Sequence, residues 1–146
     1  MQITSPAFNH NDKIPVKYTC DGDNINPALD FKDVPANTQS LVLIMDDPDA
    51  PMGTWIHWVV MNMDPNTKGI LENSVPENAV LGTNTSGKQS YGSPCPPSGT
   101  HRYFFKLYAL DTKLNLSSEV KVEEVVGAMN GHILAQTELI GLYSRQ

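Results

Sequence analysis

Apolar and polar residues alternate along this chain in a way that predicts short β-strands separated by turns. The strongest strand candidates are rich in aromatic and β-branched side chains and cover residues 41–47, 55–63 and 102–110. Weaker strand patterns lie at residues 14–19 and 28–31, and residues 138–143 are expected to form a last strand. Eleven prolines and ten glycines separate these segments. The pattern therefore favours a mostly β protein.

Helical spacing is confined to residues 122–129. Val122, Val125, Val126 and Met129 fall on one face there, and Asn130-Gly131 provides a stop. A turn or a second short helix is expected at residues 132–136. Strands followed by late helices predict a sandwich or a Greek-key pair of sheets, with one or two short helices near the C-terminus. The length of 146 residues predicts a single domain, residues 1–146.

Strand periodicity puts four polar residues among buried positions. His101 and Tyr103 continue the core-facing side of one strand, and Asp47 ends the apolar face of another. His57 shares a face with Trp55, Val59 and Met61 by simple alternation. Because a buried polar group needs a partner, we expect Asp47, His57, His101 and Tyr103 to converge. Taken singly, each has an ordinary explanation as a hydrogen-bonded core residue or a turn former.

Charge and composition narrow the classes of partner that this chain could bind. Ten basic and sixteen acidic side chains give a net charge of −6, which argues against nucleic acid or an anionic membrane as the main partner. No apolar run is long enough to span a bilayer, so we expect no integral membrane contact. The first residues do not resemble a secretory signal, which predicts a cytoplasmic protein. In a reducing cytosol, Cys20 and Cys95 are expected to be free thiols.

A proline-rich segment, residues 92–100, directly precedes His101. Its three prolines lack N–H donors and fix φ, so the remaining N–H groups could be aimed at an anion as a nest. The candidate donors are those of Ser93, Cys95, Ser98 and Gly99. A rigid loop with no ligand is the alternative.

Two long motifs in this order resemble the phosphatidylethanolamine-binding protein family, whose eukaryotic members include the Raf kinase inhibitor protein. They read DPDAP at 47–51 with GTWIHW at 53–58, and YGSPCPP at 91–97 with GTHRY at 99–103. YTCDG at 18–22, Asn26-Pro27 and GHILA at 131–135 resemble the compact bacterial and archaeal branch. The similarity runs nearly from end to end.

The resemblance implies a Greek-key β-sandwich of two antiparallel sheets with a small preformed pocket for phosphate-like or phosphorylethanolamine-type groups. Carried over by motif position, the ligand-binding residues are Asp47, Asp49, Trp55, His57, Cys95, Pro97, His101 and Tyr103. The family also implies cis peptide bonds at Ala50-Pro51 and Gly53-Thr54. It places both cysteines in loops near the pocket rim, which keeps a disulfide open as an alternative to free thiols.

The chain departs from the family in two places. Ser93 stands where many compact members have Gly, and because the chain ends at Gln146 we expect it to lack the C-terminal helix of larger members. The partners expected are a small anionic ligand and a kinase or protease that the chain would modulate. The sequence does not fix the oligomeric state and leaves a homodimer open.

We therefore expect a binding protein rather than an enzyme, with no cofactor and no metal. A hydrolase is the alternative, using Ser93 or Cys95 with His101 and Asp47. Against it, the residues around Ser93 do not form the G-x-S-x-G nucleophile elbow. A metal site from His57, His101, Asp47 and Cys95 is a weaker option, because no close pair of ligands such as H-E-x-x-H occurs.

Overall fold

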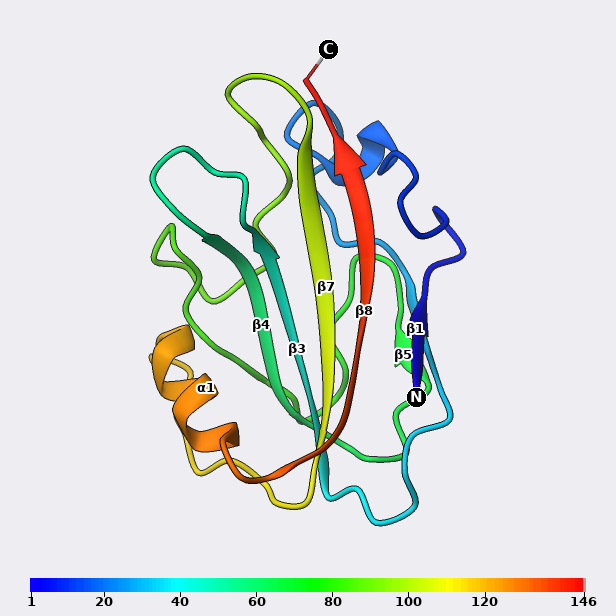
Figure 1. Ribbon diagram of the computed structural model, residues 1–146, viewed down its shortest axis with the longest axis vertical. Helices are drawn as coiled ribbons and strands as arrows, with labels where there is room; N and C mark the ends of the chain where they lie inside the picture. Colours follow the sequence, from blue (N-terminus) through cyan, green and yellow to red (C-terminus); the bar gives the residue numbers. More distant parts are fainter. Residues whose placement is uncertain (146) are drawn as a thin grey trace.

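Two antiparallel sheets form the frame of the computed structural model, which describes residues 1–145 (Figure 1). The larger sheet has the order β6-β4-β3-β7-β8 and the smaller one the order β1-β2-β5. The strands are β1 (Gln2–Thr4), β2 (Leu29–Lys32), β3 (Ser40–Asp47), β4 (Trp55–Met63), β5 (Gly69–Ile70), β6 (Val80–Leu81), β7 (His101–Leu110) and β8 (Ile133–Tyr143). A 3₁₀-helix, η1 (Val16–Tyr18), and an α-helix, α1 (Val122–Met129), complete the described elements.

The main core lies between the two sheets. Leu43, Phe105 and Leu107 of the large sheet pack in one buried cluster with Leu29 and Phe31 of β2. Every second residue of β7 faces this core, as the pleat of a strand requires, and Tyr103, Phe105, Leu107 and Ala109 are all fully buried. The mostly β fold with two antiparallel sheets is confirmed.

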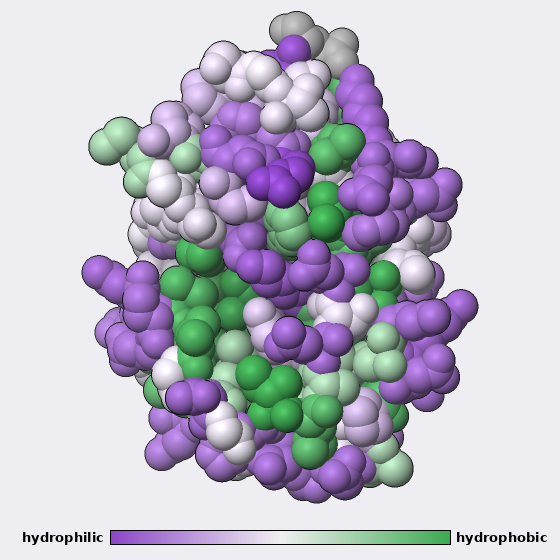
Figure 2. Space-filling view, in the orientation of Figure 1, coloured by the Kyte–Doolittle hydropathy of each residue, from purple (hydrophilic) through white to green (hydrophobic). Residues whose placement is uncertain are grey.

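A second apolar cluster lies on the opposite face of the large sheet, under α1. Val125 and Met129 of the helix pack there with Val42, Ile44 and Met61. Strand β3 is therefore buried along its whole length, because both of its faces are covered. Figure 2 shows apolar side chains gathered over the region of α1 and the start of β8, where Val126, Ile133 and Leu134 are exposed. Within residues 1–145, no helix is long and apolar enough to cross a membrane.

Several local predictions were wrong. Residues 14–19 contain the short helix η1 (Val16–Tyr18) rather than a strand, and residues 132–136 belong mainly to β8 rather than to a turn or helix. Pairing of β8 with β7 along ten positions explains the second error, because the ladder overrides local helical signals. The short strands β1, β5 and β6 were not predicted. All peptide bonds among the described residues are trans, so the two expected cis bonds are absent.

Gly141 in β8 offers a test of the core. A Cβ added there would overlap with Cγ1 of Ile14, whose side chain is fully buried. We expect Gly141→Ala to lower the free energy of unfolding by about 1–3 kcal/mol through overpacking. Gly127→Ala is the matched control, because a Cβ in α1 meets nothing within 4 Å and should stabilise the helix by about 0.5–1 kcal/mol. Urea unfolding measures both, and a Gly141→Ala protein as stable as the wild type would contradict this packing.

Candidate functional site

Three strand ends meet at one end of the large sheet and form the candidate site. Asp47 ends β3, Trp55 begins β4 and His101 begins β7, and β3 lies between the other two strands (Figure 1). The loops that follow enclose a cavity of about 390 Å³. It is lined by Asp47, Ala50, Pro51, Met52, Trp55, His57, Ser86, Gly92, Ser93, Cys95, Pro96, Pro97, His101 and Tyr103.

Asp47 and His101 form a buried pair in the cavity wall. The Nδ1–H of His101 donates to Oδ2 of Asp47 at 2.7 Å, and the two residues are 7% and 3% exposed. The other oxygen of Asp47 accepts a hydrogen bond from the backbone N–H of Asp49 at 2.8 Å. Because Nδ1 carries the proton, the free ring nitrogen of His101 is Nε2. The carboxylate thus fixes the orientation and tautomer of the imidazole.

A β-bulge places His57 in the same site. Asp46 pairs with Ile56 and Met45 pairs with Trp58, so His57 is an extra residue in β4. Without this bulge, alternation would put His57 on the face of Val59 and Met61, which pack under α1. The bulge turns it instead towards Tyr103, whose ring it meets edge-on at 5.3 Å.

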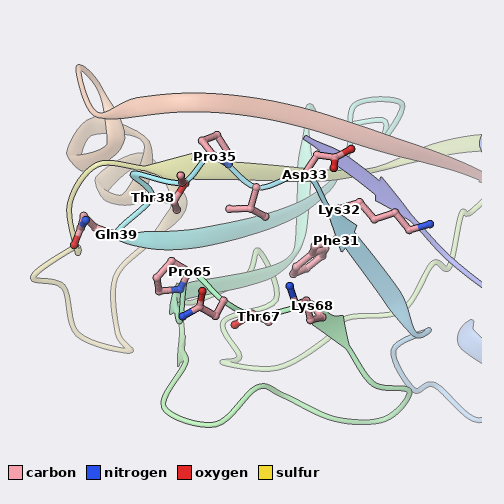
Figure 3. A pocket seen from close by; sticks show the side chains of 12 residues that line it. Phe31, Lys32, Asp33, Pro35, Thr38, Gln39, Pro65, Thr67 and Lys68 are labelled. Carbon is pink, nitrogen blue, oxygen red and sulfur yellow. The ribbon is translucent and has the colours of Figure 1, made fainter.

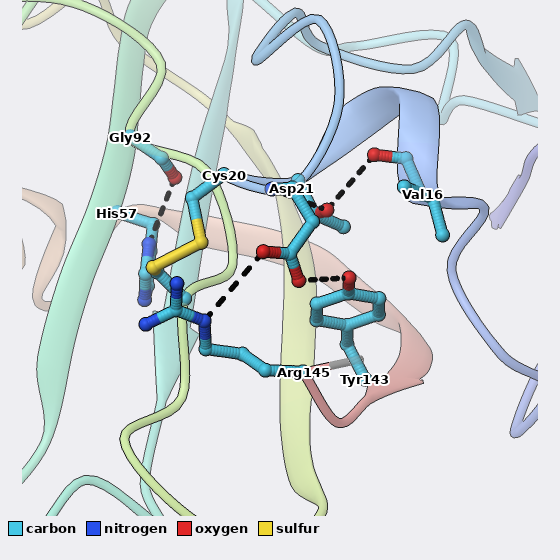
Figure 4. The surroundings of a disulfide bond; sticks show 9 residues. Val16, Cys20, Asp21, His57, Gly92, Tyr143 and Arg145 are labelled. Carbon is cyan, nitrogen blue, oxygen red and sulfur yellow. Dashed lines mark hydrogen bonds and ion pairs between the residues drawn. A yellow bond between two sulfur atoms is a disulfide. The ribbon is translucent and has the colours of Figure 1, made fainter.

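The loop before β7 fixes the tautomer of His57. Its Nδ1–H donates to the carbonyl oxygen of Gly92 at 2.8 Å (Figure 4). The N–H of Gly92 donates back to the His57 carbonyl oxygen. Gly92 suits this position because a Cβ would lie only 3.1 Å from that carbonyl oxygen. Burial is the main cause that lowers the pKa of His57, while the Gly92 carbonyl and Asp47 act in the opposite direction. The neutral ring therefore has Nε2 free as a hydrogen-bond acceptor.

Tyr103 lies beside both histidines. Its ring stacks with that of His101 at 6.5 Å, and its hydroxyl is buried without a hydrogen-bond partner among residues 1–145. The backbone N–H of Cys95 lies near enough to act on its pKa but outside hydrogen-bonding geometry. Burial, followed by the charges of Asp47 and Asp49, raises the pKa of Tyr103. The phenol therefore stays protonated and needs a partner that the protein does not supply.

Asp49 does not line the cavity. Its carboxylate accepts two hydrogen bonds from the guanidinium of Arg102 and one from the Arg102 backbone N–H, all between 2.8 and 2.9 Å. These bonds lower the pKa of Asp49 to about 2. Asp49 thus ties the loop after β3 to the start of β7 rather than facing a ligand.

Cys20 and Cys95 form a disulfide, with their Cα atoms 5.4 Å apart (Figure 4). The expectation of two free thiols was therefore wrong, and the neighbouring positions implied by the family resemblance explain why. Cys95 lines the cavity, while Cys20 follows η1. The bridge thus joins the proline-rich loop to the N-terminal segment.

The proline-rich loop contributes only part of the predicted anion nest. Ser93 and Cys95 line the cavity, whereas Ser98 and Gly99 do not. Sequence reasoning missed Ser86, which reaches the cavity from a loop with no motif. Pro51, Met52 and Pro96 were also missed as lining residues, although they lie inside or beside the quoted motifs. Within the described chain, no group of three or more His, Cys, Asp or Glu side chains could hold a metal ion.

A larger hollow of about 680 Å³ lies elsewhere, among residues 31–39 and 65–68 (Figure 3). No histidine lines it, although Lys32 and Lys68 do. The smaller cavity is the better candidate because it contains the histidines of the His57–Gly92 and His101–Asp47 hydrogen bonds together with the unpartnered hydroxyl of Tyr103.

Seven of the eight predicted ligand-binding residues thus lie around one cavity, and Asp49 lies outside it.

Known proteins of similar sequence and structure indicate the family of this chain. A UPF0098 protein of Methanothermobacter thermautotrophicus is 50% identical over 99% of both chains. Among solved structures, a putative phosphatidylethanolamine-binding protein homolog, CT736 from Chlamydia trachomatis, is 45% identical with a TM-score of 0.96, over 99% of this chain and 97% of that one. YbcL of E. coli, described as a new member of the mammalian PEBP family, is 29% identical with a TM-score of 0.93, over 99% and 98%. The family model named phosphatidylethanolamine-binding protein matches residues 4–144, and the chain therefore belongs to the phosphatidylethanolamine-binding protein family.

Proposed function

We propose that this chain is a binding protein whose cavity takes a small phosphate-like anion or a phosphorylethanolamine-type group. The observation that carries the proposal is the buried Tyr103 hydroxyl, which has no partner among the described residues and lies beside two oriented histidines. A buried donor without a partner costs about 1–3 kcal/mol. A ligand oxygen in the cavity would remove that cost.

The hydrogen-bond geometry determines how the site would meet an anion. Both imidazoles use Nδ1–H inside the protein, so each has only Nε2 left for a ligand. A neutral Nε2 accepts, and a protonated Nε2 donates. An anion therefore needs a proton to arrive with it, carried either on a histidine or on the ligand. The carboxylate of Asp47 repels an anion even though both of its oxygens accept hydrogen bonds, and the same proton reduces this repulsion.

The rim of the cavity favours a group with an organic cation attached. Trp55 is 40% exposed and Met52 is 94% exposed, both in or next to the loop after β3. An indole face attracts an ammonium group by about 0.5–1 kcal/mol at an exposed site. Phosphorylethanolamine combines a phosphate for the histidines with an ammonium for this rim. A cavity of about 390 Å³ is within the usual range for small-ligand sites.

We propose that the chain is not an enzyme. The Asp47–His101 pair resembles two members of a hydrolytic triad, but no hydroxyl donates to His101 among residues 1–145. Cys95 has no thiol to act as a nucleophile while the disulfide stands. A kinase or protease partner stays a prediction from the family resemblance.

The Asp47–His101 pair has a matched control for a binding test. His132 and Asp111 form the same Nδ1–carboxylate bond at 2.7 Å, but on the surface and away from the cavity. We expect His101→Ala and Asp47→Asn to weaken calorimetric binding of phosphorylethanolamine by about tenfold or more, the value of a hydrogen bond to a charged group. His132→Ala and Asp111→Asn should bind like the wild type. Equal losses in both pairs, or none in either, would contradict the placement of the site.

The lowered pKa of His57 predicts how stability and binding depend on pH. The unfolded chain takes up the His57 proton first as the pH falls below about 6.5, so His57 contributes stability above that pH that is lost below it. An anion that accepts from Nε2 should raise this pKa, and affinity should rise as the pH falls from about 8 to 6.

NMR titration of the His57 ring tests both statements. The midpoint should lie below 6.5 in the free protein and move upward with phosphorylethanolamine. His57→Phe should remove this part of the pH dependence of unfolding. A midpoint that falls when the ligand is added would show that the ligand does not meet Nε2.

The binding proposal also predicts an absence of turnover. Generic esters, phosphate esters and peptides should not be hydrolysed, because no nucleophile is activated by His101. Spectrophotometric assays of the wild type and of Ser93→Ala provide the check. Turnover in the wild type that disappears in Ser93→Ala would instead establish the hydrolase.

A further inference from the structure

The Cys20–Cys95 disulfide is the one covalent link between the cavity wall and another part of the chain. Both half-cystines are exposed at the surface, although Cys95 also lines the cavity. Exposed disulfides are the ones that thiols reach and reduce readily. The chain has no other cysteine, so reduction changes this bond alone.

The Cys20 side of the bridge is anchored by other bonds. Thr19 is buried, its N–H donates to the Val16 carbonyl, and its hydroxyl accepts from the N–H of Asp21. The carboxylate of Asp21 also accepts from the hydroxyl of Tyr143 at the end of β8 (Figure 4). Loss of the disulfide would therefore leave the segment around Cys20 in place.

The Cys95 side has far fewer anchors. Pro94 is held because its carbonyl accepts from the N–H of Cys20 at 3.1 Å. From there to the start of β7 at His101, residues 96–100 make no hydrogen bond within the described chain. Pro96 and Pro97 have no N–H to donate. Packing buries Pro96, but among specific bonds the disulfide is thus the main restraint on the part of the loop that carries Cys95, Pro96 and Pro97 along the cavity.

We propose that this disulfide is a redox switch for the cavity: the oxidised chain holds the 95–100 wall in its binding position, and the reduced chain releases it. The inference rests on the proposed binding function. In the reduced chain the released wall must become ordered when the ligand binds. This ordering costs conformational entropy, so the reduced chain binds the ligand more weakly.

The chemistry of the switch needs a dithiol, either a small molecule or a dithiol protein. One thiolate of the dithiol attacks a sulfur of the bridge and forms a mixed disulfide, and the other bridge sulfur leaves as a thiolate. The second thiol of the dithiol then displaces the remaining cysteine. Two electrons and two protons pass to the protein, which gains two thiols, and the dithiol becomes a disulfide.

Calorimetry with phosphorylethanolamine tests the switch directly. The samples are the oxidised protein, the protein reduced with dithiothreitol, and the Cys20→Ser/Cys95→Ser double variant with and without dithiothreitol. We expect the reduced protein and the double variant to bind at least about fivefold more weakly than the oxidised protein. Dithiothreitol should not change the double variant. Equal affinities of the oxidised and reduced wild type would overturn the proposal.

Reciprocity supplies a second readout. If the ligand binds the oxidised chain more tightly, it must make the disulfide harder to reduce by the same factor. A tenfold preference would lower the reduction potential by about 30 mV at saturating ligand. Thiol–disulfide titration with and without phosphorylethanolamine measures this shift, and a potential that the ligand leaves unchanged would contradict the switch.

Amide NMR of the reduced, ligand-free protein separates a switch from a structural staple. The signals of residues 93–101 should move or broaden while those of α1 and β8 stay in place. Collapse of the whole spectrum would show that the bond holds the fold together, and the switch would be wrong. Binding that ignores redox state refutes the switch alone, whereas no binding to either form refutes the proposed function and the switch with it.

Discussion

The buried hydrogen bond between Asp47 and His101 organises the candidate site of this molecule. A carboxylate that is 3% exposed needs partners for its oxygens, and it finds them in the imidazole of His101 and the backbone N–H of Asp49. These two bonds fix the turn after β3 and the first residue of β7 together. The ring of Tyr103 then stacks on His101, and that of His57 packs against Tyr103. The cavity is the space left beside this chain of fixed rings.

Backbone restraints around the cavity come from different parts of the sequence. The bulge in β4 turns His57 towards the cavity, and the carbonyl oxygen of Gly92 holds its ring. The disulfide positions the two prolines that follow Cys95. Each restraint acts on one wall. The cavity is therefore largely preorganised for a ligand, and the wall that depends on a single covalent bond is the one most open to control.

Much of this could be predicted from the sequence, because long strands carry strong patterns. The core-facing positions of β7, from His101 to Ala109, followed from alternation alone, and α1 was predicted with its observed bounds. The three shortest strands carry too few residues for a pattern. Residues 132–136 were misjudged because pairing with β7, a non-local interaction, decides their conformation. The motifs predicted most of the residues that line the site. His57 faces the site only because of a bulge in β4, which simple alternation cannot predict. Asp49 was wrongly placed in the site because its pairing with Arg102 depends on the folded turn.

In the proposed function, His57, His101 and Tyr103 together receive one anionic group. A crystal structure of the oxidised protein with phosphorylethanolamine at about pH 6 tests this most directly. We expect phosphate oxygens within hydrogen-bonding distance of Nε2 of both histidines and of the Tyr103 hydroxyl, with the Asp47–His101 bond unchanged. A ligand bound in the hollow beside Lys68, or a phosphate in the cavity that meets none of the three side chains, would contradict it.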